Sequence, residues 1–172
     1  MKNKIILIFF TIIALQVKAQ NSDTIYWSSS HKLKFDDFQG ASDTTKIDLA
    51  NSHIGIWYIY NVVNNKLQFK VSCFFLKKKS WIKYDMNTIV EHEQIHFDIA
   101  KLFALKLEKK LQQCEITPSL DIDLKIIYNN IVTERLAMDN LFDATIKGAK
   151  DDSCQKKFML TVKKEINAYK TR

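Results

Sequence analysis

The pentapeptide His92-Glu93-Gln94-Ile95-His96 holds the residues whose types and spacing could do chemistry. On a helix, residues four apart lie on the same face, with their Cβ atoms about 6 Å from each other. Two imidazoles placed in this way can bind one zinc ion at about 2.0–2.1 Å. Glu93 lies beside them, where it could accept a proton from a water molecule on that ion. The pattern predicts zinc ligands at His92 and His96 and a catalytic base at Glu93.

The sequence around this pentapeptide favours a buried, functional position over an exposed helix face. Apolar residues flank it or interrupt it at Ile89, Val90, Ile95, Phe97 and Ile99. A solvent-exposed helix face carries mostly polar residues. We therefore expect the two histidines to bind a metal ion rather than only to face solvent.

A catalytic zinc ion usually has three protein ligands, so a third donor must come from elsewhere in the chain. The alternatives are two upstream histidines and three downstream carboxylates: His31, His53, Glu134, Asp139 and Asp143. Asp139 and Asp143 lie one helical turn apart and share a face with Lys147. Three more side chains could act as electrophiles near the metal: Tyr128, Arg135 and Lys147. The spacing alone leaves these alternatives open.

The elements that must position these residues divide near residue 85. Strand-like segments dominate residues 20–84, at 24–27, 32–35, 54–60 and 67–75. The last two are rich in aromatic and β-branched residues and predict a hairpin across a polar loop at 61–66. Residues 36–52, with Gly40 and several Ser, Thr and Asp residues, predict a loop.

The period becomes helical in residues 85–172. The first helix is expected to begin near Thr88, because Thr88-Ile89-Val90-Glu91 has the form of a capping box. A connection at 112–123 contains the only proline. A second helix is expected over about 124–146, ended by Gly148, and a third over about 152–169. Antiparallel strands followed by three helices predict one α+β domain.

The first nineteen residues have the pattern of a signal peptide: a basic start, an apolar run from Ile5 to Leu15 and Ala19 at the exit. The run is too short for a membrane span. Without Lys2, Lys4 and Lys18 the net charge falls from +7 to +4. So small an excess does not indicate nucleic-acid binding. We expect a secreted or periplasmic protein with no membrane span after cleavage.

Export changes the interpretation of the three cysteines, since disulfides form outside the cytoplasm. Cys73 lies in an apolar stretch and is expected to be a buried thiol. Cys114 and Cys154 lie near predicted helix ends, so they are the better candidates for a pair.

The chain resembles a bacterial family of predicted secreted zinc-dependent proteases, catalogued as domain of unknown function 922. The strongest likeness is Glu91-His92-Glu93-Gln94-Ile95-His96-Phe97-Asp98-Ile99-Ala100, where residues around the motif match as well. Other similar segments are Lys32–Gly40, Ser80–Lys83 and Leu141–Gly148, together with Gln155 and Phe158. The likeness spans nearly all of residues 20–172.

This resemblance implies a single zincin-like metallopeptidase domain over residues 20–172, with an active helix, bound Zn²⁺ and a peptide or protein substrate. In the family a histidine tends to precede the glycine where this chain has Lys147. A lysine could not replace a histidine ligand without losing its proton. Asp143 matches the family pattern, so it is the first choice for the third ligand and Glu134 the second. The alternative is a catalytically impaired zinc-binding module with a structural or partner-binding role.

Overall fold

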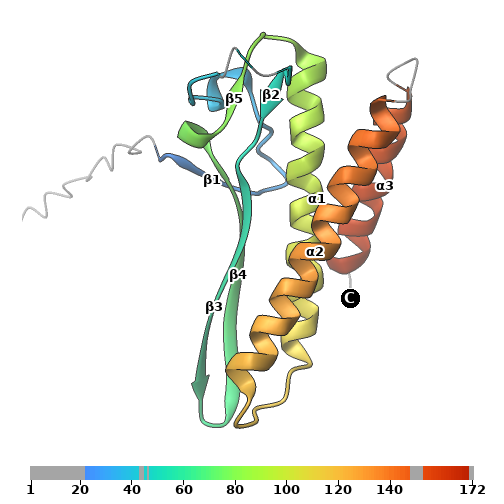
Figure 1. Cartoon of the computed structure of the whole chain (residues 1–172). Helices are drawn as coiled ribbons and strands as arrows, with labels where there is room; N and C mark the ends of the chain where they lie inside the picture. Colours follow the sequence, from blue (N-terminus) through green and yellow to red (C-terminus); the bar gives the residue numbers. More distant parts are fainter. Residues whose placement is uncertain (1–21, 43–44, 46, 148–152, 171–172) are drawn as a thin grey trace, which may run out of the picture.

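The computed structural model describes residues 22–42, 45, 47–147 and 153–170. An antiparallel sheet has the order β1 (Thr24–Tyr26), β4 (Lys66–Leu76), β3 (Ile54–Val63). Three helices follow: α1 (Asn87–Gln112), α2 (Leu120–Lys147) and α3 (Ser153–Lys170). A small second sheet pairs β2 (Ala50–Asn51) with β5 (Trp81–Ile82) beside the start of α1 (Figure 1). The prediction of an α+β fold, with strands before helices, is confirmed.

The hairpin of β3 and β4 is longer than the sequence predicted. The two strands pair continuously from Ile54 with Phe75 to Val63 with Lys66. Asn64 and Asn65, with φ of 50° and 57°, form the turn between them. Two successive positive φ angles define a type I′ turn, which asparagine tolerates and which matches the strand twist. The prediction of a loop over 61–66 is wrong because this asparagine pair turns the chain in two residues.

The predicted strand at 32–35 is also wrong. A short 3-10 helix, η1 (Phe35–Asp37), begins there instead. The Leu33 N–H donates to the Gln94 side-chain oxygen (2.8 Å) and the Lys34 N–H to an Asp37 carboxylate oxygen (2.9 Å). Side chains therefore take the main-chain donors that a neighbouring strand would have taken. The predicted loop at 36–52 contains the end of η1 and all of β2, and a second 3-10 helix, η2 (Lys77–Lys79), follows β4.

The helices differ from prediction mainly at their ends. α1 begins at Asn87, after Met86, and no side chain caps it, so the predicted capping box at Thr88 is wrong. α2 begins at Leu120, earlier than predicted, where the Ile122 N–H donates to the Ser119 carbonyl at 2.9 Å. Gly148 and the leader of residues 1–19 lie outside the described residues. No helix in the described part of the chain is long and apolar enough to cross a membrane.

Helix α1 is the centre of the fold. It packs against the sheet on one side and against α2 and α3 on the other (Figure 1). Among its fully buried side chains are Leu102 and Leu107, and Phe97 packs on Phe75 of β4 with ring centroids 6.1 Å apart. Because α1 is held on both sides, its first half gives a rigid support for the predicted chemical residues.

The predicted pairing of Cys114 with Cys154 is wrong, because both residues are free thiols. Cys114 follows the end of α1, whereas Cys154 lies in the first turn of α3, at the opposite end of the helix layer (Figure 1). Cys73 is buried, as predicted, and burial raises its pKa to about 12.

Candidate metal centre

Three donor atoms from two helices converge at one end of the molecule. His92 Nε2 and His96 Nε2 of α1 lie 3.2 Å apart. Asp143 Oδ1 of α2 lies 3.2 Å from His92 Nε2 and 3.1 Å from His96 Nε2. His92, His96 and Asp143 form the one cluster of three or more potential ligand residues among the residues that the structure describes. The structure thus brings together the three residues named as ligands from the sequence.

The size of this triangle fits a zinc ion. Ligand atoms about 2.0–2.1 Å from a tetrahedral centre lie about 3.3 Å from one another. The observed separations of 3.1–3.2 Å are close to that value. Two imidazole nitrogens and one carboxylate oxygen are also donor types that zinc accepts, and three protein ligands leave a fourth position open.

Asp139 holds His96 from the other side of its ring. Its Oδ1 lies 2.9 Å from His96 Nδ1, opposite the nitrogen that faces Asp143. A carboxylate at Nδ1 fixes the ring orientation and favours the proton on that nitrogen, which leaves the Nε2 lone pair free for a metal. Asp139 was a candidate ligand from its spacing, and the structure instead gives it the position of a supporting residue.

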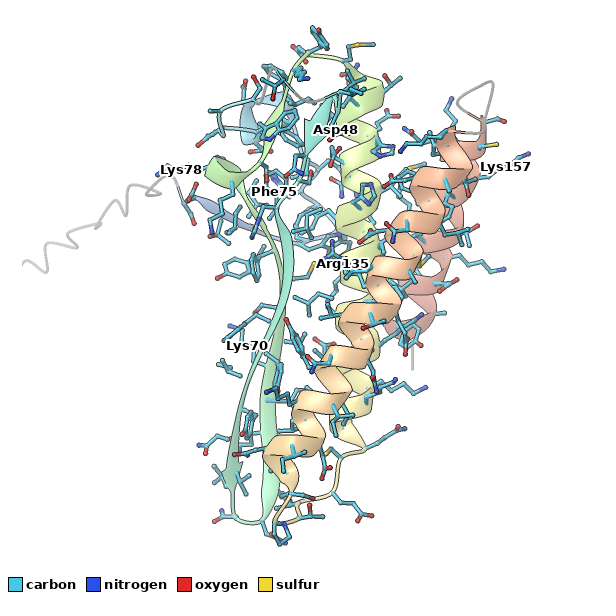
Figure 2. The ribbon with its side chains drawn as sticks, in the orientation of Figure 1. Asp48, Lys70, Phe75, Lys78, Arg135 and Lys157 are labelled. Atoms are coloured by element: carbon cyan, nitrogen blue, oxygen red, sulfur yellow. The ribbon has the colours of Figure 1, made fainter. Side chains whose placement is uncertain are left out.

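Arg135 extends this support to the sheet. Its Nε pairs with Asp139 Oδ2 at 2.9 Å, and its Nη1 donates to the carbonyl of Ile54 at 3.1 Å. Figure 2 shows Arg135 in this position, between α2 and the sheet. Arg135 was predicted as an electrophile for a substrate, but these contacts already engage its guanidinium.

His92 is supported by different groups. Burial and the neighbouring His96 lower its pKa, while the Asp143 carboxylate and the Gln155 side chain act in the opposite direction. Gln155, a buried residue of α3, also donates to the Thr88 carbonyl of α1 at 3.3 Å. Reasoning from chemical motifs missed this role, because a single glutamine has no recognisable spacing; only the resemblance singled it out.

The ionisation of the other two groups in the triangle follows from their pairing. Burial lowers the pKa of His96, but the carboxylates of Asp139 and Asp143 outweigh burial and raise the pKa to about 9. The hydrogen bond from His96 lowers the pKa of Asp143. Each partner therefore stabilises the charged form of the other, so a cation that enters the triangle would displace the proton on His96 Nε2 and meet an ionised Asp143 carboxylate.

Phe142 sets the rings at this spacing. It is fully buried, and its ring centroid lies 4.6 Å from that of His92 and 5.1 Å from that of His96. Phe158 of α3 packs behind it at 4.9 Å. Because Phe142 directly precedes Asp143, the residue that packs α2 on the histidines also brings the carboxylate to them.

Glu93 lies next to the triangle and is 7% exposed. Burial raises its pKa, and an interaction with Ser52 partly offsets that rise. Both residues line a cleft of about 940 Å³ that also contains His92, His96 and Asp143. One wall of the cleft is the segment from Ile47 to Ser52, which includes β2, and Lys147 lies on the other wall. Figure 2 shows Asp48 beside β2 at this end of the molecule.

The other candidate ligands lie elsewhere. Glu134 is exposed and its carboxylate oxygen lies 3.5 Å from Lys110 Nζ, so its choice as the second candidate is wrong. His31 Nε2 lies 3.6 Å from an Asp37 oxygen. His53, just before β3, is exposed, and neither upstream histidine belongs to the cluster in the described residues.

Tyr128, predicted as an electrophile, also serves a different purpose. Its hydroxyl donates to the Ile56 carbonyl of β3 at 3.0 Å, and it is not among the residues that line the cleft. Of the three predicted electrophiles, Arg135 and Lys147 line the cleft.

No family model, curated protein or solved structure matches this chain. The resemblance to the family of predicted secreted zinc-dependent proteases thus stays a prediction that rests on residues of this sequence.

Proposed function

We propose that this chain is a zinc-dependent peptidase that hydrolyses peptide bonds with an activated water molecule. The observation that carries the proposal is the triangle of His92 Nε2, His96 Nε2 and Asp143 Oδ1, with sides of 3.1–3.2 Å, next to the buried Glu93. In this proposal His92, His96 and Asp143 hold the zinc ion. When bound, zinc would lower the pKa of a water molecule towards about 7 and polarise a substrate carbonyl.

Glu93 acts as the general base and then the general acid. Its carboxylate accepts a proton from the attacking water and later delivers that proton to the nitrogen of the departing amine. Burial raises the pKa of Glu93. The carboxylate is therefore a stronger base towards the water, and the carboxyl group keeps the proton until the amine leaves. Removing the carboxylate without changing its shape tests this role most directly.

Asp139 and Gln155 act as positioning residues. Asp139 keeps the His96 ring in the orientation that points Nε2 at Asp143, and Arg135 holds Asp139 by an ion pair. Gln155 interacts with the His92 side chain from α3. These contacts pre-organise both imidazoles, so little rearrangement is required when a cation enters.

The cleft supports a peptide as the substrate. Its volume of about 940 Å³ is larger than the volume of a single small side chain of a substrate. One wall of the cleft is the short strand β2 with the segment before it. The proposed setting is the periplasm or the cell exterior, because residues 1–19 have the pattern of a signal peptide.

The test is a comparison of the parent protein with Glu93→Gln, each loaded with zinc. We expect both proteins to bind one zinc ion per chain and Glu93→Gln to lose about 10²–10⁴-fold in peptide hydrolysis, the usual contribution of general acid–base catalysis. Digestion of casein or a peptide library, with and without a chelator, measures the activity. Equal cleavage by both proteins would contradict the assignment of Glu93.

A second candidate function is zinc binding without turnover, in a structural or partner-binding module. Lys147 favours it, because it lies on the cleft wall where the resembled family tends to have histidine. One zinc ion per chain without chelator-sensitive cleavage would support this second function. A parent protein that binds no zinc after loading would contradict both.

A further inference from the structure

Strand β3 forms one edge of the three-stranded sheet along its whole length. In a two-residue hairpin the residues that flank the turn, here Val63 and Lys66, form a hydrogen-bonded pair, and the pairs then alternate. The alternation agrees with the Leu76 N–H, which donates to the His53 carbonyl at 2.9 Å. Odd-numbered residues of β3 therefore bond to β4, and the N–H and C=O groups of even-numbered residues point away from the sheet.

In the first half of this edge, side chains of α2 donate to two outward carbonyls. Arg135 Nη1 donates to the Ile54 carbonyl at 3.1 Å, and the Tyr128 hydroxyl donates to the Ile56 carbonyl at 3.0 Å. No partner is found within the described part of the chain for the outward main-chain groups of Tyr58, Tyr60 and Val62. The second half of β3 is thus an open edge.

This open edge lacks the features that protect edge strands. Residues 54–63 contain no charged residue and no proline, and they are rich in aromatic and β-branched side chains. On the outer face, Trp57 is 61% exposed and Ile59 is 58% exposed. A long, uncharged edge strand with exposed apolar side chains pairs readily with another strand.

We propose that β3 binds β3 of a second copy of this chain in an antiparallel arrangement centred on Tyr60. The two-fold axis pairs Tyr58 with Val62 of the partner and Tyr60 with its own counterpart. Each of these pairs can exchange two main-chain hydrogen bonds. On the outer face, Trp57 then lies opposite the partner's Val63, and Ile59 opposite the partner's Asn61.

The position of α2 is compatible with this axis. The Tyr60 hydroxyl donates to Asp121 Oδ1 at 2.6 Å, and Asp121 is in the first turn of α2. The helix therefore begins at the level of the axis, and the two copies of α2 extend from it in opposite directions. An axis nearer Ile54 would instead meet the donors of α2.

The lysines of the neighbouring strand also permit this arrangement. The charged side chains of β4 are Lys66 and Lys70, each one strand inward from the open edge (Figure 2 shows Lys70). Across the joined sheet the lysines of the two copies are three strand spacings apart, about 14 Å. This separation exceeds the Debye length of about 8 Å at physiological ionic strength, so their repulsion is screened.

The expected dimer is weak. The apolar area available for the contact is on the order of 400 Å² per copy, if one whole aromatic side chain buries about 150–250 Å². It comes from the exposed parts of Trp57, Ile59, Tyr60, Val62 and Val63. Stable interfaces bury about 800 Å² per partner. We therefore expect a dimer that forms at micromolar concentrations and dissociates on dilution.

Sedimentation velocity of the purified protein over about 1–500 µM tests the proposal, since this range spans micromolar dissociation constants. Val62→Pro removes an N–H that bonds to nothing in the monomer but is needed for pairing with the partner's Tyr58. Ile59→Lys leaves the strand paired with β4 but places two ammonium groups close together across the axis. Each variant is expected to raise the dissociation constant about tenfold or more.

The matched control is Tyr26→Lys. Tyr26 is 63% exposed on β1, at the other edge of the sheet, so a lysine there adds the same single positive charge as Ile59→Lys but away from the proposed contact. We expect it to dimerise as the parent does. Circular dichroism checks that each variant is folded, and Ile59→Lys decides the matter if Val62→Pro does not fold. A parent that stays monomeric throughout, or a dimer that neither variant weakens, would overturn the proposal.

Discussion

The two ends of helices α1 and α2 differ in how their polar groups are used. At the cleft end, His92, His96 and Asp143 face one another across 3.1–3.2 Å, with carboxylates and imidazoles packed together. At the hairpin end the same helices meet through apolar residues such as Leu111 and Leu124, which are 1% and 0% exposed. Polar groups concentrated at one end are costly for the fold unless a ligand or partner satisfies them. The hairpin end thus supplies stability, and the cleft end holds the groups that we propose to bind zinc.

The strongest test of this contrast is Asp143→Ala. Structural zinc sites with four protein ligands bind with about 10–16 kcal/mol, or about 2.5–4 kcal/mol per ligand, so loss of one of the three ligands here should weaken zinc affinity by about 10²-fold or more. Titration against a competing chelator measures the affinity. Glu134→Ala is the control, since Glu134 contacts Lys110 on the outside of the helix pair and should have no effect. Equal losses in both variants would mean that Asp143 is not a ligand.

At the hairpin end, Leu124→Ala should instead lower the free energy of unfolding by about 2–5 kcal/mol, because it leaves a cavity at a fully buried position. Urea denaturation of the zinc-free protein measures this change. Zinc bound per folded chain should stay the same. A variant that keeps its stability but loses zinc would reverse the division of roles between the two ends.

A smaller effect is expected for Asp139→Asn. The asparagine can still reach His96 but no longer carries the charge that pairs with Arg135. Loss of such a supporting carboxylate typically costs about 10–100-fold in metal affinity. The measurement is the same chelator competition. No loss at all would show that the orientation of His96 depends on packing, including that of Phe142, rather than on the charge of Asp139.

The turn at the tip of the hairpin should respond by about 1–2 kcal/mol. Asn65 has φ of 57°, and a β-branched residue is strained in this region, so Asn65→Val should lower the free energy of unfolding by that amount. Asn65→Gly is the matched control and should keep the parent's stability, because glycine adopts positive φ readily. If valine is tolerated equally well, the turn is not of type I′.

The smallest effect is expected from chemical modification of the exposed thiols, which should leave the stability of the protein unchanged. Cys114 and Cys154 are free and partly exposed, one at each end of the helix layer, so a thiol reagent should modify both in the native protein. Cys73 should react only after unfolding, because it is buried and its pKa is raised to about 12. Three reactive thiols in the native protein, or none, would contradict this arrangement.

The sequence predicted those features that depend on neighbours in the chain. The spacing of His92 and His96 placed both imidazoles on one face of a helix, and the change of period near residue 85 separated strands from helices. The register between α1 and α2 does not follow from neighbours in the chain, because it depends on how Phe142 packs against the two histidine rings. Spacing alone therefore could not choose among Glu134, Asp139 and Asp143, and the resemblance was needed to rank them.

Other failures have local causes. The predicted capping box had the right letters, but α1 starts one residue before Thr88, so that residue lies inside the helix rather than at its cap. The 32–35 segment has strand-like composition, yet its N–H groups bond to Gln94 and Asp37 side chains. A sequence pattern cannot show which distant or nearby side chain will take a main-chain donor.

The contact between Asp143 and the two histidines has a mechanical consequence. α1 and α2 are joined covalently at the hairpin end by residues 113–119, and at the other end they meet through these three side chains (Figure 1). An ion shared by both helices there would close a loop of about fifty residues, which restricts the unfolded chain as a crosslink does. Such an ion would crosslink the two helices at the end where residues 113–119 do not join them.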